Sequence, residues 1–138
     1  MEILFENEYG EDSNLNSSNF TQSLINVIRG EEIPCESVTI IWVDDEELRH
    51  MHIQFLDDPT YTDVMTFNMG DDEHVEAELY ISVDRAKDHS EKFSVTVENE
   101  LCRLVIHGML HLAGYDDHTE PEQNEMRALE NKYLSMIF

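Results

Sequence analysis

Residues 107–118 read HGMLHLAGYDDH, and this stretch sets the expectations for both the end of a helix and a functional site. His107 and His111 are four residues apart, so on a helix their imidazoles project from one face, about one turn from each other. Gly114 suits the left-handed position that commonly ends a helix. The chain can then fold back and bring one of the next residues, up to His118, towards the histidine pair.

Two imidazole nitrogens on one helix face can bind a single zinc ion, at bond lengths of about 2.0–2.1 Å. The arrangement is similar to that of zinc peptidases, in which a glutamate follows the first histidine and acts as general base. Gly108 occupies that position here, which argues against a peptidase. The residues alone leave a second interpretation open, a pair of helix-face histidines hydrogen-bonded to acidic side chains.

The long helix that carries the histidine pair is one of eight elements that the apolar pattern predicts. Period-2 alternation and β-branched residues predict four strands, at residues 1–8, 36–45, 64–69 and 77–84. Helical periodicity and capping residues predict four helices, at residues 20–30, 45–55, 94–113 and 120–137. The order βαβαββαα predicts an α/β (α+β) fold, a small sheet packed with helices, in a single domain spanning residues 1–138.

The charge of the chain is strongly negative. It has 31 acidic and 8 basic residues and a net charge of -23, so it repels polyanions at long range. This argues against non-specific nucleic-acid binding driven by counterion release, and against DNA as a partner. The acid excess fits a solvated surface, or attraction to a basic partner such as a ribosomal protein.

The chain shows no targeting or membrane-spanning pattern. No apolar stretch approaches the roughly 20 residues that span a bilayer, and the N-terminus lacks a basic region followed by an apolar run. We therefore expect a cytoplasmic protein without membrane contact. Cys35 and Cys102 are too few and too far apart for a disulfide framework or a cysteine zinc site, and we expect both to be buried thiols.

HGMLHLAGYDDH resembles the signature of the YbeY family, the bacterial rRNA-maturation endoribonucleases. Ten of the eleven positions of that signature, H-G-x-L-H-L-x-G-Y-D-H, are met from His107 to Asp116. PTYTDVMTF (59–67), AELYISVDRAKDH (77–89) and NEMRALENKYL (124–134) are similar to further family segments, so the resemblance covers roughly residues 36–138. It implies a mostly four-stranded sheet and a site for one Zn²⁺ ion at the end of the long central helix.

Two positions depart from the family. The third histidine of the signature is replaced by Asp117, and His118 follows one residue later. Either can be the third ligand, and Asp117 is favoured because it keeps the family spacing after Gly114. In addition, Leu56 stands where most of the family carries an arginine that is thought to act on the phosphate. Arg49, Arg85 or Arg103 are candidates to replace it.

The resemblance implies a zinc-dependent single-strand endoribonuclease of small-subunit rRNA 3′-end maturation and ribosome quality control. Its partners would be rRNA and the small ribosomal subunit or its proteins. Asp63 and Asp116 are the predicted catalytic residues, which orient the attacking water or a ligand imidazole. His52 is a weaker candidate for the same cleft. The alternatives are a zinc hydrolase of another class, such as a peptidase, and a non-catalytic zinc-binding ribosome-assembly factor.

Overall fold

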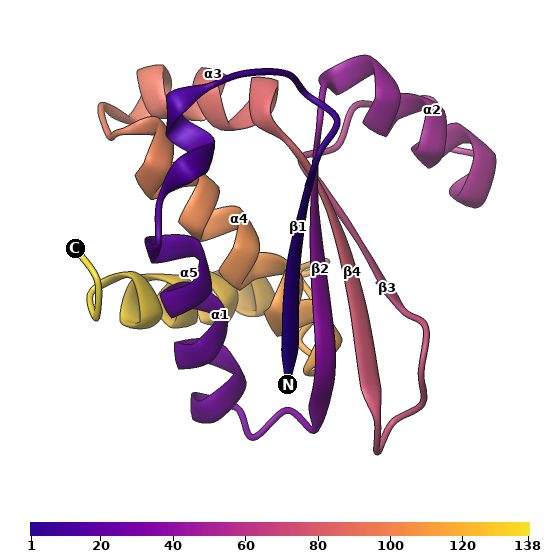
Figure 1. Ribbon diagram of the computed structural model, residues 1–138, viewed down its shortest axis with the longest axis vertical. Helices are drawn as coiled ribbons and strands as arrows, with labels where there is room; N and C mark the ends of the chain where they lie inside the picture. Colours follow the sequence, from indigo (N-terminus) through magenta and orange to yellow (C-terminus); the bar gives the residue numbers. More distant parts are fainter.

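The computed structural model describes residues 1–138, and its strands form a four-stranded mixed sheet (Figure 1). The strand order is β1 (Glu2–Asn7), β2 (Cys35–Val43), β4 (Val75–Ser82) and β3 (Val64–Asn68). β1, β2 and β4 run parallel, and β3 pairs antiparallel with β4. β4 buries Val75, Ala77, Leu79 and Ile81 on one face, whereas its other face carries Glu76 and Glu78; in β2 only residues 40–43 are buried on both faces.

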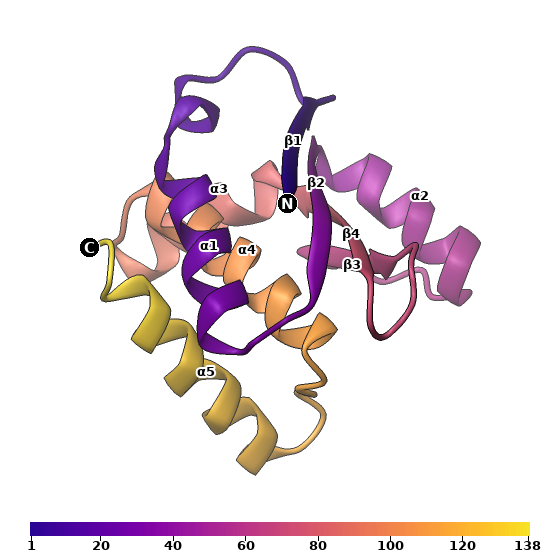
Figure 2. The same cartoon turned by 60° about the horizontal axis from the view of Figure 1, so that its bottom comes forward.

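Helices cover the two faces of the sheet unequally. Figures 1 and 2 show α1 (Asn19–Gly30), α3 (Val83–Phe93), α4 (Val97–Leu112) and α5 (Glu120–Leu134) on one side, and α2 (Asp45–Leu56) alone on the other. The four-helix side encloses the main core, a cluster of 24 buried residues. The α2 side encloses a small cluster of Ile41, Val43, Leu48 and Met65. The main core therefore lies between the sheet and the helix layer that includes α4.

α4 is the most deeply buried helix, and Gly108 explains how closely it approaches the sheet. A Cβ atom at Gly108 would lie 2.8 Å from Leu79 Cδ2 and 3.1 Å from Thr66 Cγ2. Real Cβ atoms essentially never come within 3.0 Å of a neighbour, so any larger residue at this position would displace the Leu79 side chain against which α4 packs. A glutamate at this position, as in zinc peptidases, has no room.

The predicted α/β fold and all eight predicted elements are confirmed, with ends shifted by a few residues. α3 was not predicted, nor was a short 3₁₀ helix at Ser13–Asn16. α3 has a short buried face, Val83, Ala86 and Ser90, and its first two residues lie within the segment 77–84 that was predicted as a strand. Its start is set by the Ser82 side chain, which accepts a hydrogen bond from the Arg85 backbone N–H.

The two cysteines do not form a disulfide bond. Both cysteines are free thiols; Cys102 is buried as expected, whereas Cys35 is only half-buried at the start of β2. No helix has the length and apolar character needed to cross a membrane.

Candidate metal centre

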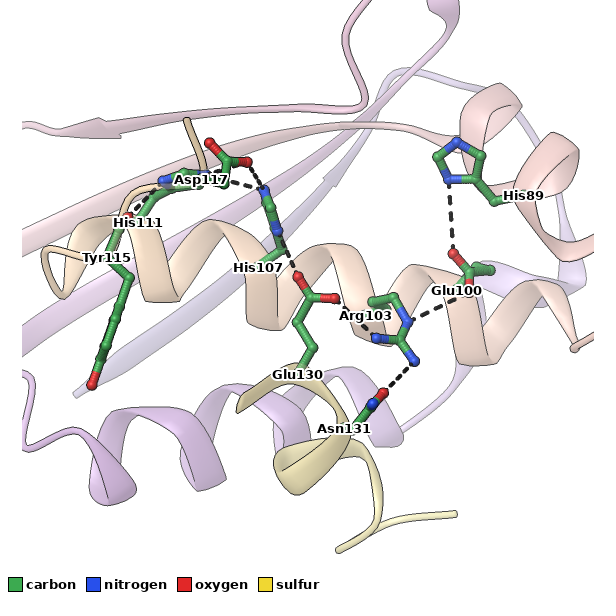
Figure 3. A network of polar contacts seen from close by, with 9 residues as sticks. All are labelled: His89, Glu100, Arg103, His107, His111, Tyr115, Asp117, Glu130 and Asn131. Atoms are coloured by element: carbon green, nitrogen blue, oxygen red, sulfur yellow. Dashed lines mark hydrogen bonds and ion pairs between the residues drawn. The ribbon is translucent and has the colours of Figure 1, made fainter. Parts of the chain in front are cut away.

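His107, His111 and Asp117 point their side chains towards one another at the C-terminal end of α4 (Figure 3). The two Nε2 atoms are 3.0 Å apart. Asp117 Oδ2 lies 3.5 Å from each of them. All three side chains are half-buried, and their ligand atoms lie within 4.8 Å of one another.

The turn after α4 brings Asp117 to the histidines. Gly114 has a φ of +106°, which side-chain-bearing residues rarely adopt. The Gly114 N–H donates to the His111 carbonyl and the Tyr115 N–H to the Leu110 carbonyl, each at 3.1 Å. These two bonds form a Schellman motif, and the reversal of chain direction places Asp117 beside His111.

The same turn, together with α5, determines which nitrogen of each imidazole carries the proton. His107 Nδ1 lies 2.7 Å from Glu130 Oε2, and His111 Nδ1 lies 2.9 Å from the Tyr115 carbonyl oxygen. A carboxylate and a carbonyl can only accept, so both Nδ1 atoms must donate. In the neutral rings, both Nε2 atoms then carry lone pairs that are available to a metal.

The facing donor atoms fit a zinc ion. Two lone pairs at 3.0 Å, beside a carboxylate oxygen, repel one another unless a proton or a cation lies among them. Ligands of a tetrahedral zinc ion with bonds of about 2.0–2.1 Å are about 3.3 Å apart. The observed separations of 3.0 and 3.5 Å bracket that value, so the residues present suit the ion that the sequence predicted.

Glu130 anchors this centre from α5, and it was not among the predicted site residues. Its carboxylate also accepts a hydrogen bond of 2.9 Å from Arg103 Nη1. Burial opposes the ionised form, but the hydrogen bonds and charges of His107 and Arg103 outweigh it and hold the pKa of Glu130 below its ordinary value. Burial lowers the pKa of His107, yet Glu130 outweighs burial and raises that pKa. Ligand histidines generally donate their second nitrogen to such an acceptor.

The only sequence signal for Glu130 is weak. It lies within NEMRALENKYL, the segment that resembles the C-terminal helix of the family. A buried glutamate on an otherwise amphipathic helix is uncommon, because charged residues are almost never fully buried without a partner. The sequence shows neither the burial nor the partner.

The other predicted site residues lie apart from the triad. His118 is exposed and close to Glu122, and it is outside the ligand group. Neither Asp63 nor Asp116 faces an Nδ1 atom of a ligand imidazole, because Glu130 and the Tyr115 carbonyl occupy both positions. Their role in orienting the attacking water stays a prediction. Asp116 is exposed. Asp63 is half-buried and lines a pocket of about 250 Å³ together with His107.

The arginines considered as replacements at Leu56 have other partners. Leu56 itself is exposed at the end of α2. Arg49 bonds to the Pro59 carbonyl, and Arg85 bonds to Asp45.

The third candidate arginine and His52 are also engaged. Arg103 bonds to Glu130 and Asn131. His52 Nδ1 lies 2.9 Å from the Thr60 carbonyl and lines none of the pockets around the triad, so it secures the loop after α2.

The chain is similar to several known proteins. A family model described as Endoribonuclease YbeY matches residues 4–137. A curated protein of that name from Flavobacterium johnsoniae is 32% identical over 133 residues, covering 96% of this chain and 94% of the relative. One from Amoebophilus asiaticus is 36% identical over 115 residues, covering 83% and 78%. A solution structure of a Thermotoga maritima protein matches with a TM-score of 0.65 and 31% identity, over 98% of this chain and 87% of that one.

Proposed function

Because the chain belongs to the YbeY endoribonuclease family, we propose that it is a zinc-dependent endoribonuclease that cleaves single-stranded RNA. The metal requirement is supported by one observation: the side chains of His107, His111 and Asp117 converge. Both Nδ1 atoms face acceptors, which leaves the two Nε2 atoms for a metal. A bound zinc ion would lower the pKa of a water molecule and polarise a phosphoryl oxygen.

The protein's own side chains have separate roles in this proposal. Glu130 and the Tyr115 carbonyl fix the imidazole tautomers, and Asp117 contributes the one anionic ligand atom. Asp63 is better placed than the exposed Asp116 to accept the proton of the attacking water, because it lines a pocket with His107. An anionic third ligand weakens the electrophilicity of the metal, so proton removal by Asp63 gains importance.

We further propose that the substrate is small-subunit rRNA near its 3′ end, in the cytoplasm, during ribosome assembly and quality control. The resemblance of HGMLHLAGYDDH to the family signature supports this assignment. The net charge of -23 supports action on the ribosome, where basic proteins compensate for repulsion between the enzyme and RNA. The same charge favours the second candidate, a non-catalytic zinc-binding assembly factor.

One experiment separates these functions. Purified protein, with zinc or with a chelator, is incubated with single-stranded RNA and with casein, and His111→Ala is compared with His118→Ala. We expect the wild-type protein to cleave RNA. The chelator and His111→Ala should abolish this cleavage, whereas His118→Ala should retain it. Cleavage of casein alone would indicate a peptidase. Cleavage of neither substrate, with co-sedimentation with ribosomes, would indicate the assembly factor.

A further inference from the structure

Two pockets lie on either side of His107. One, of about 300 Å³, extends past Asp117 to the first turns of α5, where Gln123 and Asn124 line it. The other, of about 250 Å³, extends towards α3 and is lined by Asp63, His89, Phe93 and Leu104. His107, Arg127 and Glu130 line both pockets. The two hollows therefore adjoin, and we call their combined extent the triad groove.

The triad groove is acidic, so a phosphodiester chain needs a cation there. Its carboxylates come from Asp63, Asp117 and Glu130, and its arginines are Arg103 and Arg127. A negatively charged backbone would be repelled by three carboxylates at close range unless a positive group faces it. The hydrogen-bond and ion-pair partners of Arg103 and Arg127 decide which of the two can face the phosphodiester backbone.

Arg103 is fully engaged within the protein. Its Nη1 donates to Glu130 and its Nη2 to Asn131, each at 2.9 Å, while Nε lies 3.6 Å from Glu100 (Figure 3). Contact with a substrate would require Arg103 to break this set and would leave the buried Glu130 without a cation, which is costly.

Arg127 has no such partner. It is exposed on α5, and it makes no hydrogen bond, no ion pair and no contact with an aromatic face. In a chain with 31 acidic and 8 basic residues, only Arg29 shares this condition, and Arg29 lies at the end of α1 outside the groove. A guanidinium group presents paired N–H donors that match a phosphate.

We propose that Arg127 is the residue that contacts the RNA phosphate next to the His107, His111 and Asp117 triad. This assignment rests on the proposed endoribonuclease function. The bound strand follows the triad groove across His107, and the ring of Phe93, which is 51% exposed, offers a stacking surface at the far end. Such stacking accepts any base, as single-strand binding requires.

The test compares Arg127→Gln with Arg29→Gln, which changes the net charge equally. Binding of a labelled 2′-O-methyl oligonucleotide of about 12 nucleotides is measured by fluorescence anisotropy on zinc-loaded protein at several salt concentrations. We expect Arg127→Gln to weaken binding by about tenfold. The slope of log affinity against log salt should fall by about 0.7, the loss of one single-strand phosphate contact. Arg29→Gln should match the wild type.

Zinc content and RNA cleavage of each variant complete the test. Arg127→Lys, which keeps the charge but loses the paired donors, should bind with intermediate affinity. If Arg127→Gln binds like Arg29→Gln while wild-type protein still cleaves RNA, the assignment is overturned and the nuclease function stands. If Arg127→Gln loses zinc, Arg127 serves the triad instead, which also overturns it. If wild-type protein neither binds nor cleaves RNA, the proposed function falls and the assignment with it.

Discussion

Asp117 occupies the position at which this chain departs from the histidine signature that it otherwise follows. Its Oδ2 lies 3.5 Å from both Nε2 atoms, whereas His118 is exposed and outside the group. The backbone explains the choice, because Gly114 and the Schellman motif keep the loop in the family spacing. A slip of one residue would be needed to bring His118 to the same point.

The identity of the third ligand can be tested by zinc content. We expect Asp117→Ala to lose most of its zinc after dialysis, because two imidazoles alone leave half of the tetrahedral shell to water. His118→Ala should retain zinc at the wild-type level, as measured by atomic absorption. Loss of zinc from His118→Ala alone would show that the loop rearranges around the metal.

Glu130 provides a second test at the level of single residues. Glu130→Gln weakens the hydrogen bond to His107 Nδ1 and removes the negative charge that raises the basicity of the imidazole. We expect zinc affinity to fall roughly 10–100-fold, measured by competition with a chromogenic chelator. The matched control is Glu125→Gln, an exposed residue of the same helix, which should leave affinity unchanged. Equal affinities in the two variants would remove Glu130 from the site.

At the level of elements, the packing of α4 on the sheet depends on Gly108. Alanine in a helix usually stabilises relative to glycine by about 0.5–1 kcal/mol, but here its Cβ would press on Leu79. We expect Gly108→Ala to lower the free energy of unfolding by about 1–3 kcal/mol, measured by urea denaturation. Leu79→Ala in the same chain removes the clash, so the two effects should be less than additive. A stabilised Gly108→Ala would contradict the close approach.

The junction of β1 and α2 contains a pH-dependent pair. A hydrogen bond with Glu8, burial and the charges of Glu8 and Asp44 raise the pKa of Glu47 from 4.5 to about 7. The folded state therefore binds this proton more tightly than the unfolded state. The resulting contribution to stability is complete below pH 4.5 and is lost as the pH rises through about 7.

Glu47→Gln removes that dependence on pH. We expect the variant to gain stability over the wild type as the pH rises from about 5 to about 8, measured by urea denaturation of chelator-treated protein. The control for net charge is Glu73→Gln, which removes one exposed carboxylate from a loop. A gain that is equal at both pH values, or equal in the control, would show that Glu8 and Glu47 do not share a proton.

At the level of the whole molecule, the charge of -23 sets the response to salt. Like charges repel in the compact state, and the screening length falls from about 10 Å at 0.1 M salt to about 3 Å at 1 M. We therefore expect sodium chloride to raise the Tm of the zinc-free protein, measured by circular dichroism. Chloride is the appropriate anion, since sulfate strengthens apolar burial by itself. A Tm that falls or stays constant would show that ion pairs outweigh the repulsion.

The sequence alone determined most of the helices and strands, because a strong apolar period of about 3.6 or 2 residues fits only one kind of secondary structure. The apolar period of residues 94–113 can only be buried as a helix, and β-branched runs such as residues 36–45 favour strands. α3 was missed because its buried face is short, Val83, Ala86 and Ser90, and because its first two residues were assigned to the preceding strand. The spacing of His107 and His111 was enough to predict that their side chains lie together, because residues four apart lie about one helical turn apart on the same face.

Only the tertiary structure decided what surrounds that pair. Glu130 is 23 residues from His107 in the chain, and its contact depends on how α5 crosses α4. Arg103 is paired with Glu130, whereas Arg127 is the unpaired cation beside the triad. The local sequence around each arginine does not show this difference. Local propensity acts over a few residues, whereas hydrogen bonds and charge compensation join elements that only packing brings together.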